Sequence, residues 1–307
     1  MKKETSNANL RVLVVCSANS GKIVPYIREQ VEAIANQGAL VDFFLIQRKG
    51  VVGYVRAFKK LLRKINAYKP DIIHAHYGLS GLFATMQRKV PVVTTYHGSD
   101  INNASIRFLS RIAIKLSKYN IFVSQKLAAI VLPKQKFVVL PCGVNLSVFY
   151  PQDKKTARQV LGVDAEKKMV LFAGAFSNLV KNYPLAKATL DLLPDVDLIE
   201  LKGYSREQVA LLLNAVDAVL MCSYTEGSPQ FIKEAMACNC PIVSTPVGDV
   251  PEQLNELEGC YLSEANPQLL AEALKQAFIF NKKTSARERV LSMDNNLIAK
   301  QLIVLYN

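Results

Sequence analysis

Two glutamates separated by seven residues are the most informative chemical feature of the sequence. Glu226 precedes the segment Ser228-Pro229-Gln230, and Glu234 follows within a helix predicted over 229–238. Ser228 is a good N-cap residue and Pro229 suits the first helical position, so backbone N–H groups at 228–231 are expected to point out of the helix N-terminus. Such amides bind anions, and the flanking carboxylates accept hydrogen bonds from hydroxyl pairs. Together they predict a ligand with an anionic centre and hydroxyls on both sides, as in a nucleoside diphosphate sugar.

A single cation follows the first predicted strand of the second half of the chain. Lys181 lies in the loop 174–182, and lysine is a point charge suited to phosphate. Spacing alone leaves two alternatives open: an ordinary capped helix whose Glu226 and Glu234 are solvated, and a solvated loop lysine. Open α/β sheets bind ligands outside the carboxyl ends of their strands, which is where all three residues are expected.

The three histidines lie in the first half of the chain. His74 and His76 end one predicted strand, and His97 follows the next strand together with Asp100. His97 is the better candidate for a reaction site because it lies beyond a carboxyl edge, whereas His74 is expected to be structural. Gly21, His76 and Asp100 are the other residues of the first half that are expected to line the ligand cleft.

Short apolar runs rich in β-branched residues alternate with amphipathic helical patterns along the chain. This alternation is typical of right-handed crossover units and of parallel sheets covered on both faces. Prolines and a glycine in 141–151 interrupt it, as an inter-domain linker would. The expected fold class is α/β, with two Rossmann-like doubly wound domains (1–150 on the acceptor side, 151–285 for the nucleotide sugar), a ligand cleft between them and a closing helix over 286–307. The expected strands are 11–16, 41–46, 71–75, 91–96, 120–124 and 137–140, then 169–173, 196–200, 217–222, 241–244 and 260–262.

The charge of the chain is concentrated in its first half. The net charge is +13 over 307 residues. Residues 1–150 contain 22 Lys and Arg against 6 Asp and Glu, a balance of +16, while residues 151–307 contain 16 against 19. A basic half is typical of proteins that bind nucleic acid, anionic lipid or an acidic substrate. The alternative is a basic surface that is only solvated and binds no such partner.

Other patterns narrow the class of protein. Residues 1–9 lack the apolar core of a signal peptide and no run of about 20 apolar residues occurs, so a cytoplasmic protein is expected. The six cysteines have no metal-ligand spacing and are expected to be reduced core thiols. The segment 17–22 lacks the glycine fingerprint of a nicotinamide-dependent oxidoreductase. A nucleic-acid binder would explain the basic half but not Glu226 and Glu234 beside a helix N-terminus, so no nucleic-acid partner is expected.

Taken together, these segments resemble glycosyltransferase family 4, whose members have the two-domain GT-B fold and are retaining enzymes that use nucleotide-sugar donors. The resemblance spans nearly the whole chain. Its most specific part is the Glu-x7-Glu pair with the Glu-Ala-Met-Ala helix. It rests on His74-Ala75-His76-Tyr77-Gly78, His97-Gly98-Ser99-Asp100, Pro141-Cys142-Gly143-Val144-Asn145, Lys181-Asn182, Glu226 with Glu234, and Thr245-Pro246-Val247-Gly248.

The resemblance implies a role for each site residue. Glu226 would contact hydroxyls of the transferred sugar, Glu234 the ribose and Lys181 the diphosphate, while His97 would line the reaction site. The donor's sugar-phosphate end would meet the loop 227–230. The implied activity is transfer of a hexose or N-acetylhexosamine to a glycan or lipid-linked acceptor in cell-surface polysaccharide biosynthesis, with no metal or other cofactor and no protein nucleophile.

Two departures from the family pattern bear on this expectation. Gly174-Ala175 stands where the family often has Gly-Arg, so one phosphate cation is absent and its neutralising role is unassigned. The family's Gly-Gly loop appears only as Asn19-Ser20-Gly21. The missing arginine motivates the alternative of a catalytically silent nucleotide-sugar-binding subunit of a transferase complex.

Two basic amphipathic helices predict peripheral binding to an anionic membrane surface. Lysine and arginine side chains cluster on the polar faces of the helices predicted over 54–68 and 105–118, and apolar stripes run along the other faces. The alternative is that both stripes cover the sheet of a doubly wound domain and leave only charge for lipid. The bases are Arg56, Lys59, Lys60, Arg63 and Lys64, then Arg107, Arg111, Lys115 and Lys118.

Overall fold

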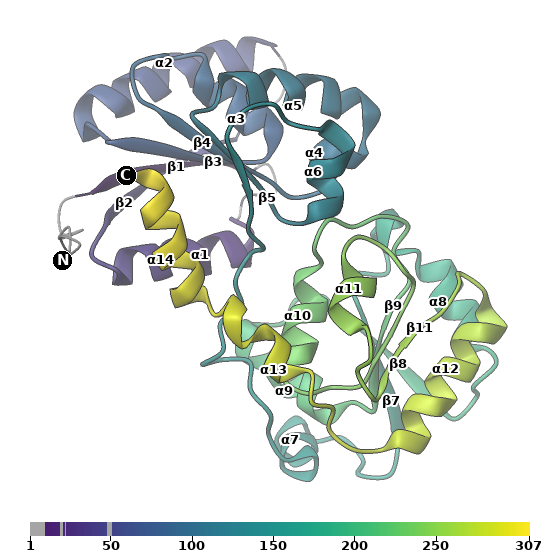
Figure 1. Ribbon diagram of the computed structural model, residues 1–307. Helices are drawn as coiled ribbons and strands as arrows, with labels where there is room; N and C mark the ends of the chain where they lie inside the picture. The colour runs from purple at the N-terminus through teal and green to yellow at the C-terminus, as the bar shows by residue number, and fades with distance from the viewer. Residues whose placement is uncertain (1–9, 19–20, 22, 48–50) are drawn as a thin grey trace. The chain divides into compact units, whose positions relative to one another are not determined.

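In the computed structural model, the chain divides into two compact units. The first unit holds residues 1–143 together with 295–307, and the second holds residues 144–294. The chain therefore leaves the first unit once, builds the second, and returns to the first for its last helix (Figure 1). The structure describes residues 10–18, 21, 23–47 and 51–307.

A six-stranded parallel sheet forms the centre of the first unit, in the order β2-β1-β3-β4-β5-β6. Its strands are short apolar runs such as Val12–Val15, which are buried because helices cover both faces of the sheet. The order reverses between β1 and β3, and ligands bind beyond the carboxyl ends of the strands at such a switch point. The strands are β1 (Arg11–Ser17), β2 (Leu40–Ile46), β3 (Ile72–His76), β4 (Val92–Tyr96), β5 (Tyr119–Phe122) and β6 (Phe137–Val139).

Helices from both ends of the chain cover one face of this sheet. α1 (Pro25–Asn36) packs against α14 (Asn295–Tyr306), and both contribute apolar side chains to one core cluster with β1 (Figure 1). On the other face α2 (Val51–Tyr68) and α3 (Gly78–Thr85) share a second cluster, and α5 (Ala104–Leu116) packs against α3. The short helices of this unit are α4 (Ser99–Asn102) and α6 (Gln125–Val131).

The closing helix expected over 286–307 is three separate elements. A short helix α13 (Arg287–Val290) and a 3-10 turn η2 (Leu291–Met293) precede α14. Asp294 interrupts the helical backbone with φ −55° and ψ 137°, and it forms an isolated parallel bridge with Val144. The apolar residues of this segment continue across the break in the helical backbone, so their spacing does not predict where the helix is interrupted.

The second unit repeats the same topology with a five-stranded parallel sheet, in the order β11-β10-β9-β7-β8. Here the order reverses between β7 and β9, which makes the carboxyl ends of these two strands the switch point. The strands are β7 (Lys168–Phe172), β8 (Val196–Glu200), β9 (Ala218–Met221), β10 (Ile242–Ser244) and β11 (Cys260–Leu262). The helices are α7 (Lys154–Leu161), α8 (Tyr183–Leu190), α9 (Arg206–Ala215), α10 (Gln230–Ala237), α11 (Val250–Leu254) and α12 (Pro267–Phe280).

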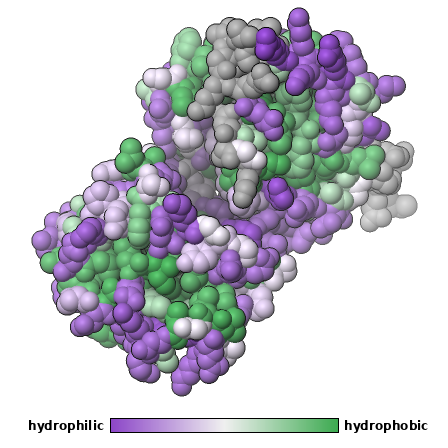
Figure 2. All heavy atoms as spheres, turned by 180° about the vertical axis from the view of Figure 1, so that it is seen from behind, coloured by the Kyte–Doolittle hydropathy of each residue, from purple (hydrophilic) through white to green (hydrophobic). Residues whose placement is uncertain are grey.

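The core of the second unit has two layers, one on each face of the sheet. Apolar residues of α9, α10 and α13 pack on one face, and those of α8 and α12 pack on the other. Hydrophilic side chains are spread over the outer surface of both units on the side that Figure 2 draws. Among the described residues no helix is long and apolar enough to span a membrane. All six cysteines are free thiols, and only Cys260 is not fully buried.

Candidate functional site

The loops after β7 and β9 bring a cation and a carboxylate together at the switch point of the second unit. Lys181 ends a 3-10 turn, η1 (Leu179–Lys181), which begins with the Asn178 side chain accepting a hydrogen bond from the Val180 amide. The Lys181 ammonium lies 2.6 Å from Glu226 Oε1, and both side chains are mostly buried, with 19% and 17% of their surfaces exposed. Residues 45 positions apart therefore form one ion pair at this edge of the sheet.

Gly174 is needed beside this lysine for steric reasons. A Cβ atom at position 174 would lie 2.8 Å from Lys181 Cγ, closer than nonbonded carbons approach. The lysine stem thus runs over the backbone of the strand-to-loop turn after β7. Gly174 therefore leaves room for the Lys181 side chain, and the neighbouring Ala175 adds no charge to the site.

A second ion pair joins α9 to α10. Arg206 is the first residue of α9, and its Nη2 lies 2.6 Å from Oε1 of Glu234, a carboxylate whose side chain is only 4% exposed. The guanidinium also lies over the ring of Phe149, 4.6 Å from the ring centroid. Arg206 was missed in the sequence. Its signal was a cation at the start of a helix, where the macrodipole disfavours positive charge unless a specific partner compensates.

The start of α10 differs from the prediction for Ser228 and Pro229. The helix begins at Gln230 with Pro229 in the N-cap position, and no side chain caps its first turn. Ser228 instead lies against Asp249 and Gln253, whose Nε2 is 3.4 Å from Ser228 Oγ. A buried carboxylate is a strong hydrogen-bond acceptor, so it engages the hydroxyl that would otherwise cap the helix.

Burial raises the pKa of Asp249, and the hydrogen bond from Ser228 acts in the opposite direction. The neighbouring Gly248 lies against the loop that carries Glu226. Its φ is +57°, and a Cβ there would be 2.7 Å from the Gly227 carbonyl oxygen. The Thr245-to-Gly248 turn therefore packs against the backbone of the loop that carries Glu226.

In the first unit the histidines form a buried chain. His74 Nε2 lies 2.8 Å from Thr95 Oγ1, and His74 Nδ1 lies 2.7 Å from the Tyr306 hydroxyl of α14. The next link joins His76 Nδ1 to His97 Nε2 at 3.0 Å. His74 and His76 stack at 4.4 Å between ring centroids.

Burial keeps the His74 and His76 rings uncharged at neutral pH. It lowers the pKa of His74 to about 3 and holds that of His76 well below the ordinary value, with smaller contributions from His74 and His97. His97 Nδ1 lies 3.6 Å from Cys142 Sγ in the linker segment. The rings of His74 and His76 are therefore neutral imidazoles.

Asp100 ties the loops after β3 and β4 together. Its carboxylate accepts hydrogen bonds from the amides of Gly78, Gly98 and His97 at 2.9, 2.9 and 3.1 Å. Burial raises the pKa of Asp100, and these amides oppose that shift. The contacts explain the His-Gly-Ser-Asp motif as a local structure that holds His97 at the carboxyl edge.

A cavity of about 340 Å³ opens at this edge of the first unit. Asp100 contributes to its wall, as do Ser17 at the end of β1 and the serines of the helices that follow β3 and β4, whereas Gly21, after β1, is exposed and has φ +80°. Asn19 and Ser20 of that loop lie outside the described residues. The cavity is lined by Ser17, Ile46, Tyr77, Leu79, Ser80, Ser99, Asp100 and Ile106.

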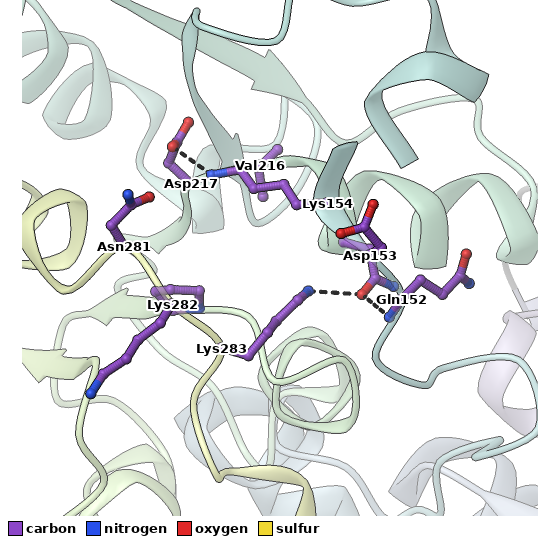
Figure 3. A pocket seen from close by; sticks show the side chains of 10 residues that line it. Gln152, Asp153, Lys154, Val216, Asp217, Asn281, Lys282 and Lys283 are labelled. Carbon is purple, nitrogen blue, oxygen red and sulfur yellow. Dashed lines mark hydrogen bonds and ion pairs between the residues drawn. The ribbon is translucent and has the colours of Figure 1, made fainter. Parts of the chain in front are cut away.

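A polar pocket of about 210 Å³ lies elsewhere in the second unit, beside the segments that enter β9 and β10 (Figure 3). Several of its polar side chains contact one another. Asp217 Oδ1 lies 2.7 Å from the Lys154 ammonium, and Lys283 donates to Asn214 Oδ1 at 2.8 Å. Because these residues precede the strands, the pocket is at the amino edge of the sheet, away from Lys181.

The chain also contains an Asp-x-Asp triplet, Asp195-Val196-Asp197, a spacing that holds divalent metals in other proteins. It lies where β8 begins, at the amino edge, and Asp197 pairs with Lys167 at 3.0 Å. Within the described part of the chain no three His, Cys, Asp or Glu side chains are arranged to hold a metal ion. The triplet is thus not part of the cluster around Glu226.

Comparison with known proteins agrees with this architecture. The family model for Glycosyltransferase Family 4 matches residues 2–148, and that for Glycosyl transferases group 1 matches residues 161–278. Sucrose-phosphate synthase from Thermosynechococcus elongatus superposes with a TM-score of 0.81 at 19% identity, over 97% of this chain and 98% of that one. The Anabaena protein HepE, solved in complex with UDP and glucose, gives 0.72 at 17% identity over 95% and 98% of the two chains.

Curated relatives are similar in sequence over much of the chain. TuaC of Bacillus subtilis (strain 168), named for teichuronic acid biosynthesis, is 27% identical over 249 residues, 71% of this chain and 64% of its own. A D-inositol 3-phosphate glycosyltransferase of Mycolicibacterium gilvum is 27% identical over 272 residues, 72% of this chain and 61% of its own. The chain thus spans about three fifths of the length of these relatives. The chain therefore combines a Glycosyltransferase Family 4 domain over residues 2–148 with a Glycosyl transferases group 1 domain over residues 161–278, in the GT-B fold of its structural neighbours.

Proposed function

We propose that this chain transfers a hexose or N-acetylhexosamine from a nucleoside diphosphate sugar to a glycan or lipid-linked acceptor, with retention of configuration, in cell-surface polysaccharide biosynthesis. The observation that carries the proposal is the charged cluster at the β7/β9 switch point. There Lys181 pairs with Glu226, and α10, which begins four residues after Glu226 without a side-chain cap, carries a second carboxylate, Glu234. A relative that is named for teichuronic acid biosynthesis and a structural neighbour that binds UDP support the class of donor and product.

Each group in the cluster has a proposed partner on the donor. Lys181 and the first amides of α10, in the segment 227–230, take the diphosphate, because positive charge at that point stabilises the leaving group. Glu226 accepts from hydroxyls of the transferred sugar and Glu234 from the ribose. The donor in this way replaces Glu226 as the partner of Lys181. His97 is the proposed residue of the acceptor side, together with His76, Asp100 and Gly21.

The proposed reaction breaks the bond between the anomeric carbon and the diphosphate oxygen. The acceptor hydroxyl forms its new bond to that carbon from the side the diphosphate leaves, through an oxocarbenium-like sugar. A donor phosphate oxygen takes the acceptor proton, so no protein nucleophile is required. Lys181 and the α10 amides supply the charge stabilisation through which this chain would accelerate the step.

The donor assignment is tested by comparing the two carboxylates. Calorimetry with UDP, GDP, ADP and their sugars identifies the nucleotide that wild type binds. Glu234→Ala is expected to weaken nucleoside diphosphate binding roughly 10-fold or more, because a hydrogen bond to a charged group is lost. Glu226→Ala is expected to reduce turnover more than nucleoside diphosphate affinity, because its proposed partner is the sugar.

The matched control is Glu272→Ala, an exposed glutamate of α12 that pairs with Lys275 at 2.8 Å. It should leave binding and turnover unchanged. Nucleotide affinities in Glu234→Ala that equal those of wild type would contradict the donor-site assignment. An equal loss of sugar and nucleotide binding in Glu226→Ala would contradict the division of roles.

A catalytically silent nucleotide-sugar-binding subunit is the second candidate, because Ala175 brings no charge to the position where the family pattern leads us to expect an arginine. Release of free nucleoside diphosphate and glycosylated product by the purified chain separates the two. Binding without turnover, under conditions in which a suitable acceptor is present, would favour the subunit.

The same proposal includes peripheral attachment to an anionic membrane surface through α2 and α5. The apolar stripe of α2 docks on the sheet, since Leu61 and Ile65 are buried, so these helices offer charge to lipid. Lys64 is held by an ion pair with Asp42 and is not part of that surface, and the side chain of Val55 lies outside the described residues. The exposed bases are Arg56, Lys59, Lys60 and Arg63, with Arg111, Lys115 and Lys118.

Vesicle co-sedimentation tests the attachment. Replacing Lys59, Lys60 and Arg63 by glutamine is expected to weaken binding to anionic vesicles roughly 100-fold, because each basic side chain contributes about 1 kcal/mol. Rising salt should also weaken the binding of the wild-type protein to these vesicles. Glutamine at the exposed residues Lys155, Lys202 and Lys282 of the second unit is the control of equal charge change. Equal binding to neutral vesicles, or none to anionic vesicles at low salt, would refute it.

A further inference from the structure

We infer that Arg206 is a positioning residue of the donor site, which holds Glu234 ready for the ribose hydroxyls and supplies the second positive charge of the site. The inference rests on the proposed function and adds a residue that the family motifs do not include. It starts from one contact: Arg206 Nη2 lies 2.6 Å from Glu234 Oε1.

Glu234 needs a partner of this kind because of where it lies. Its side chain is 4% exposed, on a helix packed into the core of the second unit. A buried carboxylate without a compensating charge takes up a proton, and a protonated carboxyl no longer accepts two hydroxyl hydrogen bonds. Arg206 therefore keeps Glu234 in the ionised form that a ribose requires.

Phe149 and the start of α9 hold the guanidinium in place. The ring is fully buried, and its own carbonyl oxygen accepts a hydrogen bond from Arg287 at 2.6 Å, so the platform under Arg206 is fixed. The guanidinium stacks on this ring at 4.6 Å, and a Ser205–Gln208 capping box fixes the helix start from which the side chain leaves. A planar cation can stack and donate in the plane at the same time, whereas an ammonium cannot.

The charge balance of the cluster gives Arg206 its second role. Glu226 and Glu234 are matched by Lys181 and Arg206, so these four side chains carry no net charge. Without Arg206, Glu234 would either keep an uncompensated negative charge in the donor site or take up a proton. Arg206 begins α9, the helix that follows β8, the strand next to β7, and it supplies the site with a second cation where Ala175 supplies none.

A binding cycle separates positioning from simple structural support. The probes are the nucleoside diphosphate that wild type binds and its 2′-deoxy and 3′-deoxy forms, measured by calorimetry. Removing a hydroxyl that meets Glu234 is expected to cost wild type roughly 10- to 100-fold in affinity. In Arg206→Ala the loss of affinity on removing the hydroxyl is expected to shrink below about 3-fold. In Arg206→Lys this loss should lie between those of wild type and Arg206→Ala, because lysine keeps the positive charge but lacks the planar guanidinium that stacks on Phe149.

The control is Lys202→Ala, an exposed cation in the same β8–α9 loop, which should keep the full penalty. Circular dichroism and melting confirm that each variant is folded. If Arg206→Ala binds the ribose form more weakly but discriminates the deoxy forms as wild type does, the positioning role is overturned while the donor site stands. If wild type binds no nucleoside diphosphate, the proposed function itself fails.

Discussion

Replacing Lys181 by alanine is expected to lower kcat for sugar transfer by about 100- to 1000-fold, the usual effect of removing one preorganised group that stabilises a leaving anion. The ammonium lies at the β7/β9 switch point, paired with Glu226 at 2.6 Å and enclosed by surrounding residues. In such a position little water screens the interaction between the ammonium and the leaving diphosphate. Its loss also leaves Glu226 uncompensated, which repels the diphosphate. Steady-state rates with the cognate donor and acceptor give the measurement.

Two variants make this result interpretable. Lys187→Ala removes an exposed lysine of α8 that pairs with Asp191 at 2.8 Å, and it should leave kcat unchanged. Lys181→Arg keeps the charge in a longer side chain and should retain part of the rate. A rate in Lys181→Ala within 3-fold of wild type would remove this lysine from the proposed chemistry.

Acid should destabilise the first unit well above the range in which carboxylates titrate. His74 stays neutral in the fold down to about pH 3, whereas in the unfolded chain it protonates near 6.5. Between these values the unfolded state binds more protons, so the free energy of unfolding falls as the pH falls. Each such histidine contributes a slope of up to about 1.4 kcal/mol per pH unit, and His76 adds to it because burial lowers its pKa as well. Denaturant titrations followed by circular dichroism between pH 8 and 5 give the slope.

His74→Gln distinguishes this source of acid sensitivity from others. Glutamine can still bond to Thr95 and Tyr306 but cannot take up a proton, so the slope below pH 6.5 should fall by up to about 1.4 kcal/mol per pH unit. The stability of the variant at pH 8 reports the cost of the changed hydrogen bonds separately. An unchanged slope in His74→Gln would mean that the acid sensitivity has another origin.

Secondary structure and topology class were largely readable from local pattern. The strand at 196–200 was expected with the bounds it has, and the helix predicted over 229–238 begins and ends within a residue of the observed one. These elements are set by apolar periodicity and by turn residues, which act over a few positions. The carboxyl-edge placement of Lys181, Glu226 and Glu234 followed from the order of strands and helices alone.

The sequence by itself determined which residue types lie at the ends of the strands, because local periodicity places them there. Only the tertiary structure decided their partners. Arg206 reaches Glu234 because α9 and α10 pack on the same face, and Ser228 is taken from its cap by Asp249, 21 positions away. His74 meets Tyr306 because α14 returns to the first unit after 151 residues of the second. Such contacts join segments distant in sequence, and no local pattern records the packing that brings them together.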